Sequence, residues 1–188
     1  MLDFAGRAST PARNIELKLK VADPARVKSL AIAAGAQPVT TLWQRDTYFQ
    51  VPRGRLKLRE EAGAPANLIW YDRADEAASR LSRYYLLPAP EPARLLEAFR
   101  EAFGVRVVVH KRRDLLQFQN VRIHLDTVEH LGDFLELEAV LAPEDAEDAG
   151  QAIVNHLLGE LEMSQAPVVA HSYAGLLLEQ KQGLSSGV

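Results

Sequence analysis

Cysteine is absent from this chain of 188 residues, and neither sign of charge is in large excess. The missing cysteine excludes disulfide bonds, thiolate metal sites and a cysteine nucleophile. The 22 basic and 25 acidic residues leave a formal net charge of −3. A protein that coats nucleic acid through charge needs a clear basic excess, so we expect no nucleic acid partner.

Long apolar runs are missing as well. No stretch approaches the ~18 apolar residues that span a bilayer, and residues 1–10 have no apolar core of a signal peptide. We therefore expect a soluble, cytoplasmic protein with no membrane partner. Apolar residues make up 47% and charged residues 25% of the chain, which is typical of a globular protein and argues against overall disorder.

Common chemical motifs are also lacking. The sequence contains no Gly-x-x-x-x-Gly-Lys loop, no Gly-x-Gly-x-x-Gly and no Gly-x-Ser-x-Gly elbow. Its five histidines show no zinc-like spacing. His124 could face an acidic strand, and we interpret it as a residue with a structural hydrogen bond rather than as a metal ligand.

The length suits one compact domain. Residues 1–12 and 181–188 are small, polar and unpatterned, so we expect a flexible leader and a flexible tail. Residues 13–180 then form a single domain.

Alternation with period two dominates this domain and predicts strands. The clearest patterns cover residues 15–21, 55–59, 105–113, 121–126 and 134–138, with weaker ones at 46–51, 67–73 and 80–87. Helices are predicted from Asp23 to Gly35, from Pro92 to Gly104, after Pro143 and, more briefly, after Ser172. Strands outnumber helices and are mostly linked by short turns, which favours an antiparallel α+β domain.

The predicted strands carry their charges on one face, because side chains alternate along a strand. If the strands closed into a barrel with this face inward, the cations could bind a polyanion and the carboxylates could hold a hard divalent metal. An open sheet with one solvated face would alternate in the same way. The separation of basic from acidic strands favours the closed barrel, because a solubilising surface would mix the signs. The charges concerned are Lys18, Lys20, Arg55, Lys57, Arg59, Lys111, Arg113 and Arg122, with Glu16, Asp126, Glu136 and Glu138.

Collinear segments at 14–20, 44–49, 54–60, 111–113, 124–138 and 171–177 resemble the CYTH superfamily, the triphosphate tunnel metalloenzymes. Class IV adenylyl cyclases and thiamine triphosphatases belong to this superfamily. The specific signal is the order of all six segments, with Leu-Asp-x-Val-x-x-Leu-Gly-x-Phe-x-Glu-x-Glu among them. The resemblance implies a closed, antiparallel, eight-stranded β-barrel that forms a tunnel, with flanking helices.

The resemblance also implies roles for individual residues. It implies Mg²⁺ or Mn²⁺ as cofactor, held by Glu16, Asp126, Glu136 and Glu138. It implies catalytic roles for Lys20, Lys111 and Arg113. It implies substrate binding by Lys18, Arg55, Lys57, Arg59, Arg73 and Arg122.

The chain departs from the family pattern at two positions. Lys18 stands where the Glu-x-Glu-x-Lys signature has its second glutamate. Tyr71 stands where the fourth strand usually ends in lysine, and Arg73, on the same face, could substitute for it.

These roles imply a metal-dependent phosphoryl-transfer enzyme whose partner is a triphosphate such as ATP, thiamine triphosphate or tripolyphosphate. A cyclase of class IV type, which converts ATP to cyclic AMP and pyrophosphate, is the leading hypothesis. The alternatives are a triphosphatase, a non-catalytic nucleotide or polyphosphate binder, and a plain structural domain. A homodimer is left open.

Overall fold

Eight antiparallel strands form a closed barrel in the computed structural model, which describes residues 12–72 and 78–185. Their order around the barrel is β1-β5-β4-β3-β2-β6-β7-β8. This confirms the predicted fold class. The strands are β1 (Ala12–Lys20), β2 (Gln37–Phe49), β3 (Arg55–Glu61), β4 (Ala64–Asp72), β5 (Arg80–Pro88), β6 (Val105–Phe118), β7 (Val121–Val128) and β8 (Gly132–Leu141).

Four helices flank the barrel in the described ranges: α1 (Pro24–Ala33), α2 (Pro92–Phe103), α3 (Glu147–Glu160) and α4 (Tyr173–Ser185). Asp23 caps α1 as predicted, because its Oδ1 accepts a hydrogen bond of 2.9 Å from the Arg26 amide. The last helix is longer than predicted and includes residues 181–185 of the expected tail. The other residues of the expected tail, 186–188, lie outside the described residues, as do residues 1–11 of the expected leader. None of the helices described is long and apolar enough to cross a membrane.

The strand β2 begins well before the predicted segment at 46–51. Most of its first nine residues are exposed, so their sequence carries no alternation from which a strand could be predicted. Their pairing is nonetheless continuous with β6 from Gln37 to Phe49, apart from two register shifts. Tertiary pairing rather than a buried face therefore determines where β2 starts.

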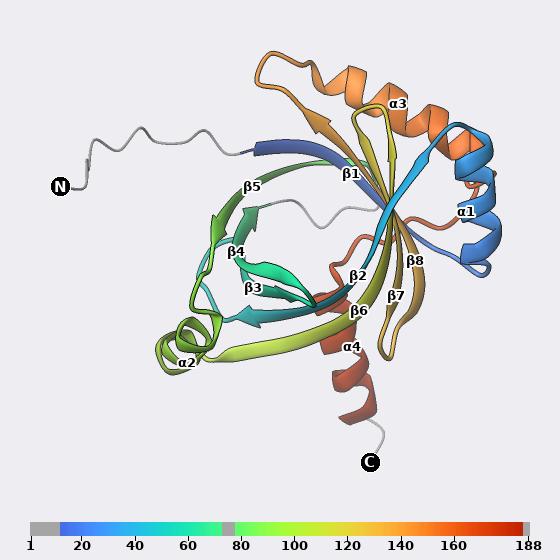
Figure 1. Cartoon of the computed structure of the whole chain (residues 1–188). Helices are drawn as coiled ribbons and strands as arrows, with labels where there is room; N and C mark the ends of the chain where they lie inside the picture. The colour runs from blue at the N-terminus through green and yellow to red at the C-terminus, as the bar shows by residue number, and fades with distance from the viewer. Residues whose placement is uncertain (1–11, 73–77, 186–188) are drawn as a thin grey trace.

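Helices α1 and α3 lie outside the barrel wall (Figure 1), and the largest apolar cluster of the described residues lies between them and the wall. Leu17 and Leu19 on β1 face these helices, whereas Glu16 and Lys18 face the interior. The alternation of apolar and charged residues thus has a direct structural consequence. The helices cover the apolar side of β1, β7 and β8, and the charged side is enclosed by the barrel.

The start of α4 occupies one end of the barrel. Tyr173, Ala174 and Leu177 pack against Val109 on β6 and Phe134 on β8. Val109 and Phe134 lie on the same strand faces as Lys111 and Glu136, because they are two residues away. The interior is therefore closed at this end by apolar and aromatic side chains.

Candidate functional site

The barrel encloses a cavity of about 140 Å³. Most of the charged residues predicted for the site line it. The charged faces of the strands therefore surround a lumen and do not form the wet side of an open sheet. The predicted residues at the cavity wall are Glu16, Lys18, Lys57, Arg59, Lys111, Arg113, Arg122, Glu136 and Glu138.

One group of charges joins β2 to β3 around Asp46, which is only 2% exposed. Arg59 holds this carboxylate with two hydrogen bonds of 2.7 Å, from Nε and Nη2, and Lys57 Nζ donates a third of 2.9 Å. Burial opposes ionisation of Asp46, but the charges of Arg59 and Lys57 outweigh it and hold the pKa of that carboxyl well below its usual value. The two cations are thus held in place by one anion.

Sequence reasoning assigned no role to Asp46, although it lies within the segment 44–49 that carries the family resemblance. The register places Asp46 directly opposite Arg59. The available signal was that Asp46 shares a strand face with Tyr48, which lines the cavity. That signal could not reveal the partner strand.

A second group of charges surrounds Asp126 on β7. Arg113 donates to both of its oxygens at 2.6 Å, and the Tyr173 hydroxyl donates at 2.9 Å. Lys111 Nζ lies 3.4 Å from Oδ2 of Asp126. Asp126 is 1% exposed. Its carboxylate is therefore engaged by protein donors, and it lies behind the cavity wall.

The ammonium group of Lys111 has an unusually low pKa. Burial and the neighbouring charge of Arg113 lower the pKa of its ammonium group to about 7, against the opposing charge of Asp126. This side chain can therefore gain or lose a proton near neutral pH. A lysine in that condition has the property required of a general base.

The acidic strand β8 contributes Glu136 and Glu138. Lys18 Nζ lies 3.0 Å from Oε1 of Glu136, and Arg113 Nη2 lies 2.8 Å from Oε2. Arg122 lies 3.8 Å from Glu138. Burial works against the charge on Glu136, but the charges of Lys18 and Arg113 outweigh it and keep the pKa of this carboxyl well below its usual value. The residue that replaces the signature glutamate is thus paired with an expected metal ligand.

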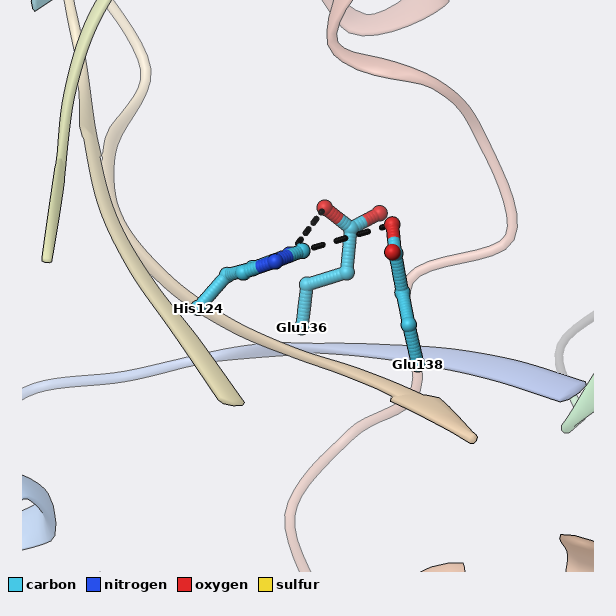
Figure 2. A group of neighbouring side chains, drawn as sticks. All are labelled: His124, Glu136 and Glu138. Carbon is cyan, nitrogen blue, oxygen red and sulfur yellow. Dashed lines mark ion pairs between the residues drawn. The ribbon is translucent and has the colours of Figure 1, made fainter. Parts of the chain in front are cut away.

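His124 lies beside these two glutamates, as Figure 2 shows. Its Nδ1 is 3.7 Å from Oε2 of Glu136 and 3.8 Å from Oε1 of Glu138. Among the described residues, Nδ1 has no hydrogen-bond partner although it is buried. The structural hydrogen bond expected for this histidine is therefore not found at Nδ1. Burial, aided by Arg113, lowers the pKa of the imidazole and favours its neutral form.

Two predicted residues lie away from the cavity, near the end that α4 closes. The Lys20 Nζ donates to the carbonyl of Leu131 and lies 4.2 Å above the ring of Phe134. Arg55 lines a separate hollow beside α4. Arg73 lies outside the described residues. Tyr71, at the usual lysine position of the fourth strand, does line the cavity.

Comparisons with known proteins agree with this architecture. The family model of the CYTH domain matches residues 12–173. The PH1012 protein from Pyrococcus horikoshii OT3 is similar to the chain at 25% identity and a TM-score of 0.79, covering 87% of this chain and 98% of its own. No curated protein matches.

Two further solved structures share the fold at lower identity. A candidate adenylate cyclase from Vibrio parahaemolyticus has 18% identity and a TM-score of 0.73, with 89% of this chain and 98% of that one covered. A candidate adenylyl cyclase from Hippeastrum, HpAC1, described as having a dominant triphosphatase activity, has 14% identity and a TM-score of 0.63, with 91% and 96% covered.

Proposed function

The chain belongs to the CYTH domain family, and from this membership we propose that it is a divalent-metal-dependent phosphoryl-transfer enzyme whose substrate carries a triphosphate. The observation that supports the proposal is the convergence of cations from four strands on one cavity. These cations are Lys18, Lys57, Arg59, Arg113 and Arg122. Charge-assisted hydrogen bonds from such groups are the usual means of holding phosphate oxygens.

In this proposal the cations exchange partners when substrate binds. Lys57 and Arg59 are paired with Asp46, and phosphate oxygens entering the cavity would compete for the same donors. The guanidinium of Arg59 can serve both, because it has five N–H donors and uses two of them on Asp46. Asp46 thus keeps the donors oriented while the substrate is absent.

The donor chemistry of the cavity fits a divalent metal. Glu136 and Glu138 offer carboxylate oxygens, which are the ligands that Mg²⁺ and Mn²⁺ prefer. Glu16 lines the same cavity from β1. When bound, such an ion offsets charge on phosphate oxygens. The expected fourth ligand, Asp126, is engaged by Arg113 and Tyr173 instead.

We assign to Lys111 the role of the base that accepts the proton of the attacking hydroxyl or water. In cyclisation of ATP, the ribose hydroxyl attacks the α-phosphorus, the bond to pyrophosphate breaks, and a base must accept the hydroxyl proton. In hydrolysis, water attacks the terminal phosphorus and loses a proton in the same way. A lysine whose pKa lies at about 7 is neutral in part of the population at neutral pH and can accept that proton. Arg113 keeps its charge throughout, because Asp126 and Glu136 outweigh the effect of burial and raise its pKa.

Cyclisation of ATP is the first candidate reaction, in keeping with the resemblance to class IV adenylyl cyclases. Hydrolysis of a triphosphate is the second candidate, in keeping with the dominant triphosphatase activity of the structural neighbour HpAC1.

A substrate panel tests the proposal. ATP, thiamine triphosphate and tripolyphosphate are incubated with the full chain and Mg²⁺ or Mn²⁺, and the products are resolved by chromatography. Cyclic AMP with pyrophosphate identifies the cyclase, and released phosphate identifies the triphosphatase. Lys111→Met should abolish turnover, whereas Arg112→Met, on the outer face of the same strand, should retain it.

Binding of tripolyphosphate, measured by calorimetry, distinguishes the remaining alternatives. Binding without turnover of any substrate would favour a non-catalytic binder and contradict the proposed enzyme. No binding at all would favour a structural domain.

A further inference from the structure

The Nδ1 atom of the buried His124 imidazole lies near two carboxylates without forming a hydrogen bond to either of them. This nitrogen is buried and has no hydrogen-bond partner among the residues described, and the residue is 4% exposed. The nearest carboxylate oxygens are 3.7 and 3.8 Å away, beyond the range of a hydrogen bond. A buried nitrogen without a partner costs free energy, and its presence beside two carboxylates calls for a physical reason.

A shared metal ion supplies that reason. Two ligand atoms that each lie ~2.1 Å from an ion are separated by about 3.0 Å at a right angle, about 3.4 Å at the tetrahedral angle and at most ~4.2 Å. The distances from Nδ1 to the two glutamates lie within this limit. Ligand atoms of all three side chains lie within 4.8 Å of one another, so a small movement of a glutamate side chain would bring every pair within the ~4.2 Å limit. We propose that His124, Glu136 and Glu138 form one divalent-metal site in which Nδ1 of His124 is a ligand.

The surrounding contacts favour this set over the one that the family resemblance implies. Both oxygens of Asp126 accept hydrogen bonds from Arg113, and Oδ2 accepts another from Tyr173. Asp126 is therefore held away from the metal by its own partners. In Glu136 the Oε2 atom accepts one hydrogen bond from Arg113, which leaves a second lone pair. That oxygen is the one nearest to His124.

The nitrogen ligand determines the class of metal. Carboxylates and water suit Mg²⁺, whereas an imidazole favours first-row transition metals. The site should therefore prefer Mn²⁺, Co²⁺ or Zn²⁺ to Mg²⁺. The inference rests on the proposed function for its purpose in phosphoryl transfer, because two of the three ligands, Glu136 and Glu138, line the proposed substrate cavity. Metal binding itself can be measured without any substrate.

Pulsed electron paramagnetic resonance of the full chain loaded with Mn²⁺ provides the test. A coordinated imidazole adds ¹⁴N modulation to the Mn²⁺ echo, which carboxylate and water ligands do not. We expect this modulation in the wild type and in His156→Gln, a control histidine on α3. We expect its loss in His124→Gln. Calorimetry should show at least tenfold weaker Mn²⁺ binding in His124→Gln, with Mg²⁺ affinity changed less than threefold.

A second variant keeps the site testable if His124→Gln does not fold. Glu138→Gln removes a carboxylate from the same ion, so it should weaken Mn²⁺ binding while the nitrogen modulation persists at saturating metal. Absence of ¹⁴N modulation in the wild type, or its persistence in folded His124→Gln, would overturn the site. Turnover in the substrate panel without nitrogen coupling would overturn this site alone. Nitrogen coupling without turnover would support the site and count against the proposed function.

Discussion

In the proposed function Asp46 competes with substrate for two cations, so its neutralisation should have opposite effects on stability and on binding. Asp46→Asn keeps the shape of the side chain and removes its charge. Lys57 and Arg59, which lie 2.9 and 2.7 Å from Oδ2 of Asp46, would then face each other without an anion between them. The free protein should become less stable, and its affinity for a polyanion should rise.

The expected stability loss follows from the burial of the pair. Removing one partner of a buried ion pair costs about 3–5 kcal/mol, and the contact of Lys57 and Arg59 with the cavity favours the lower end. At roughly 2–4 °C for each kcal/mol in a protein of this size, the melting temperature should fall by about 6–12 °C. A charge-assisted hydrogen bond contributes about 1.5–3 kcal/mol, so affinity for tripolyphosphate should rise about tenfold or more.

Thermal melting and calorimetry with tripolyphosphate, both without metal, measure the two effects. Asp114→Asn is the matched control. Asp114 also holds Lys28 and Arg112 at 2.9 and 2.8 Å, but it lies on the outer face of β6. This control should lose stability and keep its affinity within about twofold. An Asp46→Asn protein that binds tripolyphosphate no more tightly than the wild type would refute the competition between Asp46 and substrate.

Three further changes test the proposed roles of other lumen residues. Arg59→Ala should weaken tripolyphosphate binding by roughly tenfold or more, because it removes a charge-assisted contact; calorimetry that finds unchanged affinity would remove this residue from the site. Lys111 loses its proton as the pH rises through about 7, because burial lowers its pKa to that value, and only the neutral amine can accept a proton. The kcat/KM for turnover should therefore rise between pH 6 and pH 8, and a pH profile that is flat over this range would contradict the assignment. Lys18→Glu should strengthen metal binding near Glu16 and shift the metal dependence of turnover to lower concentration, since it replaces a cation that pairs with Glu136; identical metal stoichiometry and affinity in the two proteins would show that Lys18 is not near a metal.

The sequence by itself determined which side chains share a face. Alternation places Glu16 with Lys18, and Lys57 with Arg59, whatever the strands pair with, because successive residues of a strand point to opposite sides. The order of the segments that resemble the CYTH superfamily then predicted a closed barrel. Alternation does not tell how far along the barrel axis a side chain lies. For that reason Lys20 was predicted to line a cavity that it does not line.

Only the tertiary structure decided which charges oppose one another. The register places Lys18 opposite Glu136, Asp46 opposite Arg59, and Arg113 opposite Asp126. It also places His124 opposite Glu136.

These cross-strand contacts join residues far apart in the chain, and a shift of one residue would turn every side chain of a strand to the other face. Closure of the barrel and the packing of α1 and α3 on its apolar wall fix that register. For this reason the engagement of Asp126, and the position of His124 beside two glutamates, became visible only in the folded chain.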